Sequence, residues 1–184
     1  DPNAPRDLMT RGLGASPGAA TGKIVLHPDE AVEAAARGES VILVRRETSP
    51  EDIHGMLKAQ GVLTCRGGMT SHAAVVARGL SRTCVVGASS VHIDEQRRTV
   101  RFGDHVLTAG AVITLDGGDG SIIKGAVETI QPETRPELLE LMTWVDDVRR
   151  LDIYTNADTA RECRVAREFG ASGVGLCRTA VSYT

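Results

Sequence analysis

The chain has few aromatic residues and no long apolar run. Only 3% of its 184 residues are Phe, Trp or Tyr, so a core must be built from Val, Ile, Leu and Ala, the usual filling of α/β domains. No uninterrupted apolar stretch approaches the roughly 18 residues that a membrane-spanning helix needs. The opening residues, DPNAPRDLMT, lack the basic-then-apolar order of a secretion signal. We therefore expect a cytoplasmic protein that does not enter a membrane.

The chain also lacks a strong charge imbalance and any pairing pattern among its cysteines. It has 21 Lys and Arg against 24 Asp and Glu, and no basic run is interleaved with aromatics, so we expect no nucleic-acid partner. None of the cysteines forms a CxxC pair, which argues against both a zinc site and a disulfide framework. We expect reduced thiols and no bound metal at the four cysteines, which are Cys65, Cys84, Cys163 and Cys177.

The length and composition fit one well-packed domain with a smaller segment attached. Hydrophobic residues make up 41% and charged residues 24% of the chain, close to the average for soluble globular proteins. A chain of this length holds one domain of roughly 100 to 150 residues and has no room for a second of that size.

The first half of the chain alternates buried strands with helices that begin at proline or serine. Pro28 opens an Ala-rich helix, and Ser49 followed by Pro50 combines an N-cap with a proline at the first helical position. Short apolar runs between these helices are typical of buried strands. The sequence predicts strands at 23–26, 41–44 and 62–64, and helices at 28–38, 50–59 and 71–78.

The second half changes to short β-like pieces and then to a single βαβ pattern. Pieces at 84–86, 99–101, 112–115 and 121–123 are separated by Gly and Asp turns. A strand at 152–156, a helix at 159–170 and a strand at 173–177 follow. We predict an α/β protein with a linker at 1–12, a main domain at 13–130, a linker helix at 131–150 and a truncated βαβ unit at 151–184.

The chemistry is concentrated in residues 67–78, GGMTSHAAVVAR. Gly67 and Gly68 let the backbone approach a ligand closely, and Thr70 or Ser71 caps the following helix. His72 falls in the first turn of that helix, where free amides and the helix dipole favour a phosphate. A neutral imidazole at this position is a competent nucleophile toward phosphorus. His72 is thus the candidate catalytic residue, and the preceding loop is the candidate phosphate cradle.

Residues 67–78 resemble the phosphohistidine signature of the phosphoenolpyruvate-utilising enzymes at every position. Within that family, the phrases at 47–52, 61–64 and 144–149 resemble those of the pyruvate, phosphate dikinases. The resemblance implies a swivelling β/β/α domain whose histidine takes the β,γ-diphosphoryl group of ATP at an ATP-grasp domain. The γ-phosphoryl group then passes to inorganic phosphate, and the remaining phosphoryl group passes to pyruvate to form phosphoenolpyruvate.

The resemblance also assigns roles outside the histidine loop. It implies that residues 151–184 begin the (β/α)8 barrel that binds pyruvate and phosphoenolpyruvate, with Arg178 matching a phosphate-binding arginine. It implies Mg²⁺ held by other domains, with none expected on this chain. Thr70 matches a threonine that a regulatory kinase and phosphatase modify in some members, and phosphate there would repel the incoming group.

The sequence departs from the family pattern at two places. Cys65 stands where Glu is expected, and Ala180-Val181 replaces Glu-His after the barrel arginine. With two barrel strands and no nucleotide fold, the chain alone is expected to show no turnover.

Three other functions are compatible with the sequence. They are a regulatory or vestigial domain whose histidine is never phosphorylated, a carrier serving another acceptor, and a loop that binds an anion without covalent transfer. Helix capping alone would explain Thr70 and Ser71, and Arg66 and Arg78 are either surface cations or phosphate contacts.

Overall fold

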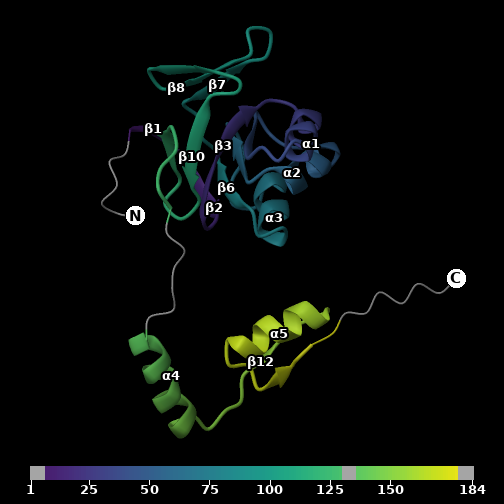
Figure 1. The fold of residues 1–184 in the computed structure, drawn as a ribbon, viewed down its shortest axis with the longest axis vertical. Coiled ribbons are helices and arrows are strands. Elements are labelled where there is room, and N and C mark those ends of the chain that lie inside the picture. Colours follow the sequence, from purple (N-terminus) through teal and green to yellow (C-terminus); the bar gives the residue numbers. More distant parts are fainter. Residues whose placement is uncertain (1–6, 130–135, 178–184) are drawn as a thin grey trace, which may run out of the picture. The chain divides into compact units, whose positions relative to one another are not determined.

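A computed structural model describes residues 7–129 and 136–177 of the chain. The described residues form two compact units that divide between residues 130 and 131. Each unit has its own secondary structure (Figure 1), and we describe them separately.

The first unit is built on an eight-stranded mixed sheet. Its strands are β1 (Leu8–Arg11), β2 (Leu13–Ser16), β3 (Ala19–Val25), β4 (Val41–Arg45), β5 (Gly61–Thr64), β6 (Thr83–Val86), β10 (Val112–Asp116) and β11 (Ser121–Lys124). They lie in the order β1-β11-β10-β3-β4-β5-β6-β2. The central strands β3 to β6 run parallel, and the strands on both sides pair antiparallel. The carboxyl ends of β4, β5 and β6 therefore meet at one edge of the sheet.

Helices cover one face of this sheet, as Figure 1 shows. They are α1 (Pro28–Ala36), the 3-10 turn η1 (Pro50–Asp52) with α2 (Ile53–Lys58), and α3 (His72–Gly79). Leu43 and Val62 from the parallel strands pack with Ala34, Ala74 and the other small helix residues of the same cluster. Because alanine has a short side chain, these helices can lie close to the strands. The position of α3 is thus fixed by its buried alanine face.

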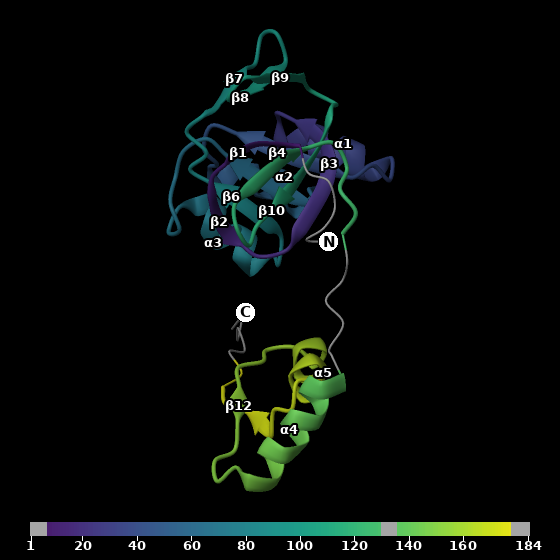
Figure 2. The ribbon, with the colours of Figure 1, turned by 90° about the vertical axis from the view of Figure 1, so that its left-hand side faces the viewer.

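A second β layer covers the opposite face of the parallel strands. Side chains alternate along a strand, so Ile42 and Leu63 point away from the helices into a second cluster. Phe102 is fully buried there, and it comes from a separate three-stranded sheet. That sheet consists of β7 (Val91–Asp94), β8 (Thr99–Phe102) and β9 (His105–Thr108), and Figure 2 shows it at one end of the unit. The predicted β/β/α domain is confirmed.

The second unit is a helix followed by a small βαβ unit. Its elements are α4 (Pro136–Val148), β12 (Tyr154–Thr155), α5 (Ala160–Glu168) and β13 (Gly173–Val174). The two strands are parallel, and Thr159 and Glu162 form the capping box that starts α5. Leu151 and Phe169 are each 81% exposed, because a single βαβ unit has too few elements to bury its apolar face.

The structure differs from the sequence prediction in several strands. Residues 8–11, predicted as part of a linker at 1–12, form β1 and pair with β11, so this stretch belongs to the sheet. Strands β2, β7 and β9 were not predicted, since each is only four residues long and carries polar or exposed positions. The predicted helix at 50–59 begins with the 3-10 turn η1. The predicted strands at 152–156 and 173–177 are shorter, at two residues each.

Candidate functional site

Three loops meet at the carboxyl ends of β4, β5 and β6. Backbone hydrogen bonds continue beyond the strands: the Cys65 amide donates to the Arg45 carbonyl at 3.1 Å and the Arg66 amide to the Arg46 carbonyl at 2.9 Å. The Ala88 amide, after β6, donates to the Thr64 carbonyl at 3.1 Å. Ligand sites in open α/β sheets lie at this end of parallel strands. The loop with the candidate catalytic histidine is the middle one of the three.

Glycines at two positions allow the loops to touch. Gly67 has a φ of +106°, and a Cβ there would lie 2.9 Å from the Ser71 Cβ. Gly87 has a φ of +63°, and a Cβ there would lie 2.6 Å from the Gly67 carbonyl oxygen. Residues with a Cβ rarely adopt such φ values. Gly68 differs, because open space surrounds its Cβ position and the backbone is accessible from that side.

Ser71 caps helix α3, and His72 is the first residue of that helix. The Ser71 Oγ accepts a hydrogen bond from the Ala74 amide at 3.4 Å, while the Ser71 amide donates to the Gly68 carbonyl at 2.9 Å. Thr70 is exposed and takes no part in the cap. The first amides of a helix have no partner within it, so the half-buried His72 side chain begins where a negative charge is favoured.

Thr48 holds one nitrogen of the His72 ring. The Thr48 Oγ1 lies 3.0 Å from His72 Nδ1. When Nδ1 carries the proton and donates it to Thr48, the lone pair of Nε2 is free to attack. Sequence reasoning missed this residue, because Thr48 appeared only inside the family-like phrase at 47–52. No local pattern connects it with a histidine 24 positions later.

Arg78 stabilises the loop from the far end of α3. Its Nε donates to the Ala74 carbonyl at 3.0 Å, and its Nη2 donates to the Met69 carbonyl. These bonds connect the loop before Ser71 to the body of the helix. Arg78 therefore contacts backbone carbonyls in this structure, whereas Arg66 is exposed and lines a cavity beside the loop.

The other candidate positions contribute little to the site as described. Burial raises the pKa of the Cys65 thiol, although the guanidinium groups of Arg46 and Arg66 act to lower it. Arg178 lies outside the described residues, as do Ala180 and Val181. Within 7–129 and 136–177, no group of three or more His, Cys, Asp or Glu side chains is arranged to hold a metal. In the same ranges no helix has the length and apolar character needed to cross a bilayer.

Two family models match this chain. Residues 37–120 match the mobile domain of PEP-utilising enzymes, and residues 133–184 match their PEP-binding domain. This chain belongs to the PEP-utilising enzyme family. The first match includes β4, β5, α3 and the whole of the histidine loop, so the site described above lies within the mobile domain of the PEP-utilising enzymes.

Among PEP-utilising enzymes, the chain is similar to several pyruvate, phosphate dikinases. It is 54% identical over 179 residues to that of Rhizobium meliloti and 49% identical over 179 residues to that of Giardia intestinalis, covering 97% of this chain and 20% of each relative. It is 46% identical over 180 residues to chloroplastic pyruvate, phosphate dikinase 1 of Arabidopsis thaliana, covering 97% of this chain and 19% of the relative. The chain thus spans about a fifth of the length of these curated relatives.

Proposed function

We propose that this chain is the phosphoryl carrier segment of a pyruvate, phosphate dikinase, with His72 as the residue that is transiently phosphorylated. The observation that carries the proposal is the placement of His72: it begins α3 behind a glycine turn, and Thr48 engages its Nδ1 at 3.0 Å. Similarity to pyruvate, phosphate dikinases over 97% of the chain supports the choice of reaction.

In the proposed reaction, His72 Nε2 attacks the β-phosphorus of ATP. A new N–P bond forms, the bond between the β-phosphorus and its bridging oxygen to the α-phosphorus breaks, and AMP leaves with that oxygen. Inorganic phosphate then takes the γ-phosphoryl group and leaves as diphosphate. The phosphoryl group that stays on His72 passes to the enolate oxygen of pyruvate, giving phosphoenolpyruvate and a free imidazole.

The residues around His72 would orient the ring and stabilise charge. The hydrogen bond to Thr48 keeps the proton on Nδ1, so that the same nitrogen, Nε2, attacks and later releases the phosphoryl group. The amides at the start of α3 and the open backbone at Gly68 would face the phosphoryl oxygens. The loop needs no side-chain base, since a neutral imidazole already has its lone pair at Nε2.

Other parts of the proposed reaction are assigned to segments outside the first unit. We place ATP and Mg²⁺ on an ATP-grasp domain, and pyruvate on the barrel that residues 151–184 begin, with Arg178 as a phosphate contact there. Thr70 is the proposed target of a regulatory kinase and phosphatase. We also propose a cytoplasmic location, which the free state of Cys65, Cys84, Cys163 and Cys177 supports.

The test measures the intact mass of the chain after incubation with ATP, Mg²⁺, inorganic phosphate and a separately prepared ATP-grasp domain of a pyruvate, phosphate dikinase. We expect an adduct of the mass of one phosphoryl group that disappears after acid treatment, because phosphohistidine is acid-labile. His72→Ala should give no adduct, while His105→Ala, on the small sheet, should give the adduct of the unmodified chain.

The partner domain is first shown to phosphorylate its own carrier domain. With that established, an unmodified mass for this chain would contradict the carrier function and favour a regulatory or vestigial domain. An adduct in His72→Ala would move the acceptor to another residue.

A further inference from the structure

The cavity that Arg66 lines lies beside the histidine loop. It has a volume of about 370 Å³, within the range of small-ligand pockets. Its walls come from the same loops after β4, β5 and β6, and from β7. The lining residues used below are Arg46, Cys65, Arg66, Ser89, His92 and Ile93.

Neither arginine of this cavity has an acidic partner in the part of the chain that the structure describes. Among the ion pairs of the described residues, none involves Arg46 or Arg66. The Arg46 Nη2 donates one hydrogen bond, to the Ile93 carbonyl at 3.4 Å. A guanidinium group has five N–H donors, so most of the donors of Arg46 remain available.

Arg46 and Arg66 line the cavity together with Cys65. Burial raises the pKa of the Cys65 thiol, and the positive charge of each arginine acts to lower it. The wall of the cavity at Cys65 is therefore within the positive field of both guanidinium groups. Ser89 and His92 add a hydroxyl and an imidazole to the lining, which gives the cavity further hydrogen-bonding groups and no carboxylate.

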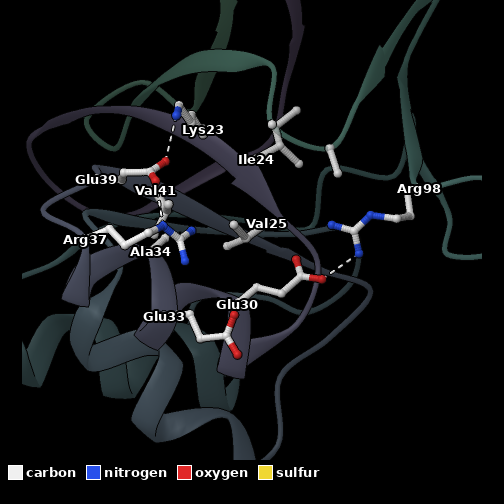
Figure 3. A pocket seen from close by; sticks show the side chains of 12 residues that line it. Lys23, Ile24, Val25, Glu30, Glu33, Ala34, Arg37, Glu39, Val41 and Arg98 are labelled. Atoms are coloured by element: carbon white, nitrogen blue, oxygen red, sulfur yellow. Dashed lines mark hydrogen bonds and ion pairs between the residues drawn. The ribbon is translucent and has the colours of Figure 1, made fainter.

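A larger cavity in the same unit provides a contrast. It lies between α1, β3 and β4, has a volume of about 450 Å³, and is shown in Figure 3. Every cation drawn there is matched by a carboxylate: Glu39 pairs with Lys23 at 2.6 Å and with Arg37 at 2.8 Å, and Arg98 pairs with Glu30 at 2.6 Å. Cations already neutralised in this way offer little to an anion.

Two of the loops that line the cavity of Arg46 and Arg66 also position His72. Arg46 is two positions before Thr48, and Arg66 directly precedes Gly67. The Arg66 amide donates to the Arg46 carbonyl at 2.9 Å, so the two arginines start from paired backbone positions. An anion in this cavity would therefore be held by the same two loops that position the His72 ring.

We propose that this cavity is a binding site for a phosphate-class dianion, separate from the cradle at the start of α3. Arginine is suited to the site because its planar fork matches two phosphate oxygens at once. Inorganic phosphate and the terminal phosphate of a larger molecule share this chemistry. The anion binds to the unphosphorylated chain, and its binding does not need His72 as an acceptor.

The experiment is a ¹⁵N NMR titration of the 184-residue chain with inorganic phosphate and, separately, with diphosphate, each against sodium chloride at the same ionic strength. We expect the amides of Cys65, Arg66, Ser89 and His92 to shift with saturation. The Arg46→Gln and Arg66→Gln variants should each weaken binding by about tenfold, the typical effect of losing a charge-assisted hydrogen bond. Arg37→Gln, in the other cavity, should bind as the unmodified chain does.

The His72→Ala variant separates this proposal from the carrier function, because it should retain the titration while losing phosphorylation. Stronger shifts with diphosphate would identify the terminal phosphate of a larger molecule as the ligand, and equal shifts would identify free phosphate. Shifts limited to residues 68–74, an unchanged affinity in both arginine variants, or the absence of saturation with either anion would overturn the proposal.

Discussion

The Oγ1 of Thr48 lies 3.0 Å from the Nδ1 of His72 and joins the loop after β4 to the first residue of α3. With this contact, Nδ1 can hold a proton that it donates to Thr48, and the lone pair of Nε2 is free to attack phosphorus. In the proposed reaction Thr48 is a positioning residue, because it would act on the phosphoryl group only through the His72 ring.

Replacing Thr48 by Val removes the hydroxyl and keeps the side-chain shape. We expect phosphorylation of His72 to slow by about fivefold, since a hydrogen bond of this kind contributes about 1 kcal/mol. The measurement is the initial rate of acid-labile phosphate incorporation between pH 6 and 9. Thr48→Ser should restore the rate and the pH profile; equal rates in the Val and Ser variants would argue against the positioning role.

A negative charge at Thr70 should block the carrier. Thr70 is exposed and two positions before His72, so Thr70→Glu places a carboxylate close to the proposed phosphoryl acceptor. We expect at least a tenfold lower phosphorylation rate with the stability of the unmodified chain, measured by mass spectrometry and urea unfolding. Thr70→Val is the uncharged control, and a similar loss in that variant would show that the hydroxyl, not the charge, matters.

Gly87→Ala should destabilise the first unit by about 1 to 3 kcal/mol. The new Cβ would combine a φ of +63° with an approach of 2.6 Å to the Gly67 carbonyl oxygen. Gly38→Ala is the matched control, because Gly38 has a φ of +76° and open space around its Cβ position. Urea unfolding should give a smaller loss for Gly38→Ala; equal losses would mean that contact with the Gly67 loop costs nothing.

The ion pair between Glu30 and Arg98 should make stability depend on acid pH. Burial would raise the pKa of Glu30, but hydrogen bonds from Arg98 and from the Leu26 amide, with the nearby positive charge, lower it overall. A lowered folded-state pKa adds stability above the ordinary value near 4.5, and this stability is lost as pH falls through the folded-state pKa.

Glu30→Gln should therefore cost below about 1 kcal/mol near pH 7 and nothing at the lowest pH at which the chain stays folded. Thermal unfolding of both proteins from pH 7 downward measures the difference. A difference in stability between the two proteins that stays the same at acid pH would show that Glu30 stabilises the fold through packing and not through its charge.

The cysteines should fall into two classes of reactivity. Cys163 and Cys177 are exposed, whereas Cys65 and Cys84 are buried, and burial raises the pKa of Cys84 to about 12. Because only thiolates alkylate rapidly, iodoacetamide at pH 8 should label the exposed pair in the folded chain and all four after unfolding, as counted by intact mass. Rapid labelling of Cys84 without denaturant would contradict its packing beneath α3.

Much of the first unit could be predicted because its signals are local. Apolar runs at 41–44 and 62–64 are buried on both faces, so they read as strands in isolation. Pro28 and Pro50 mark helix starts through their fixed φ and missing amide. Strands β1 and β2 escaped prediction because they are short edge strands, and their pairing partners β11 and β6 lie far away in the sequence.

Neighbouring residues were enough to predict the glycine turn, a cap at Thr70 or Ser71, and a place for His72 in the first turn of the helix; the structure then selects Ser71 as the cap and His72 as the first helical residue. Only the tertiary structure brings Thr48 to Nδ1 and places Arg46, Arg66 and Cys65 in the lining of one cavity that contains no carboxylate. Capping depends on residues within one turn of helix. Contacts between loops depend on the parallel alignment of β4 and β5, which packing against both layers sets.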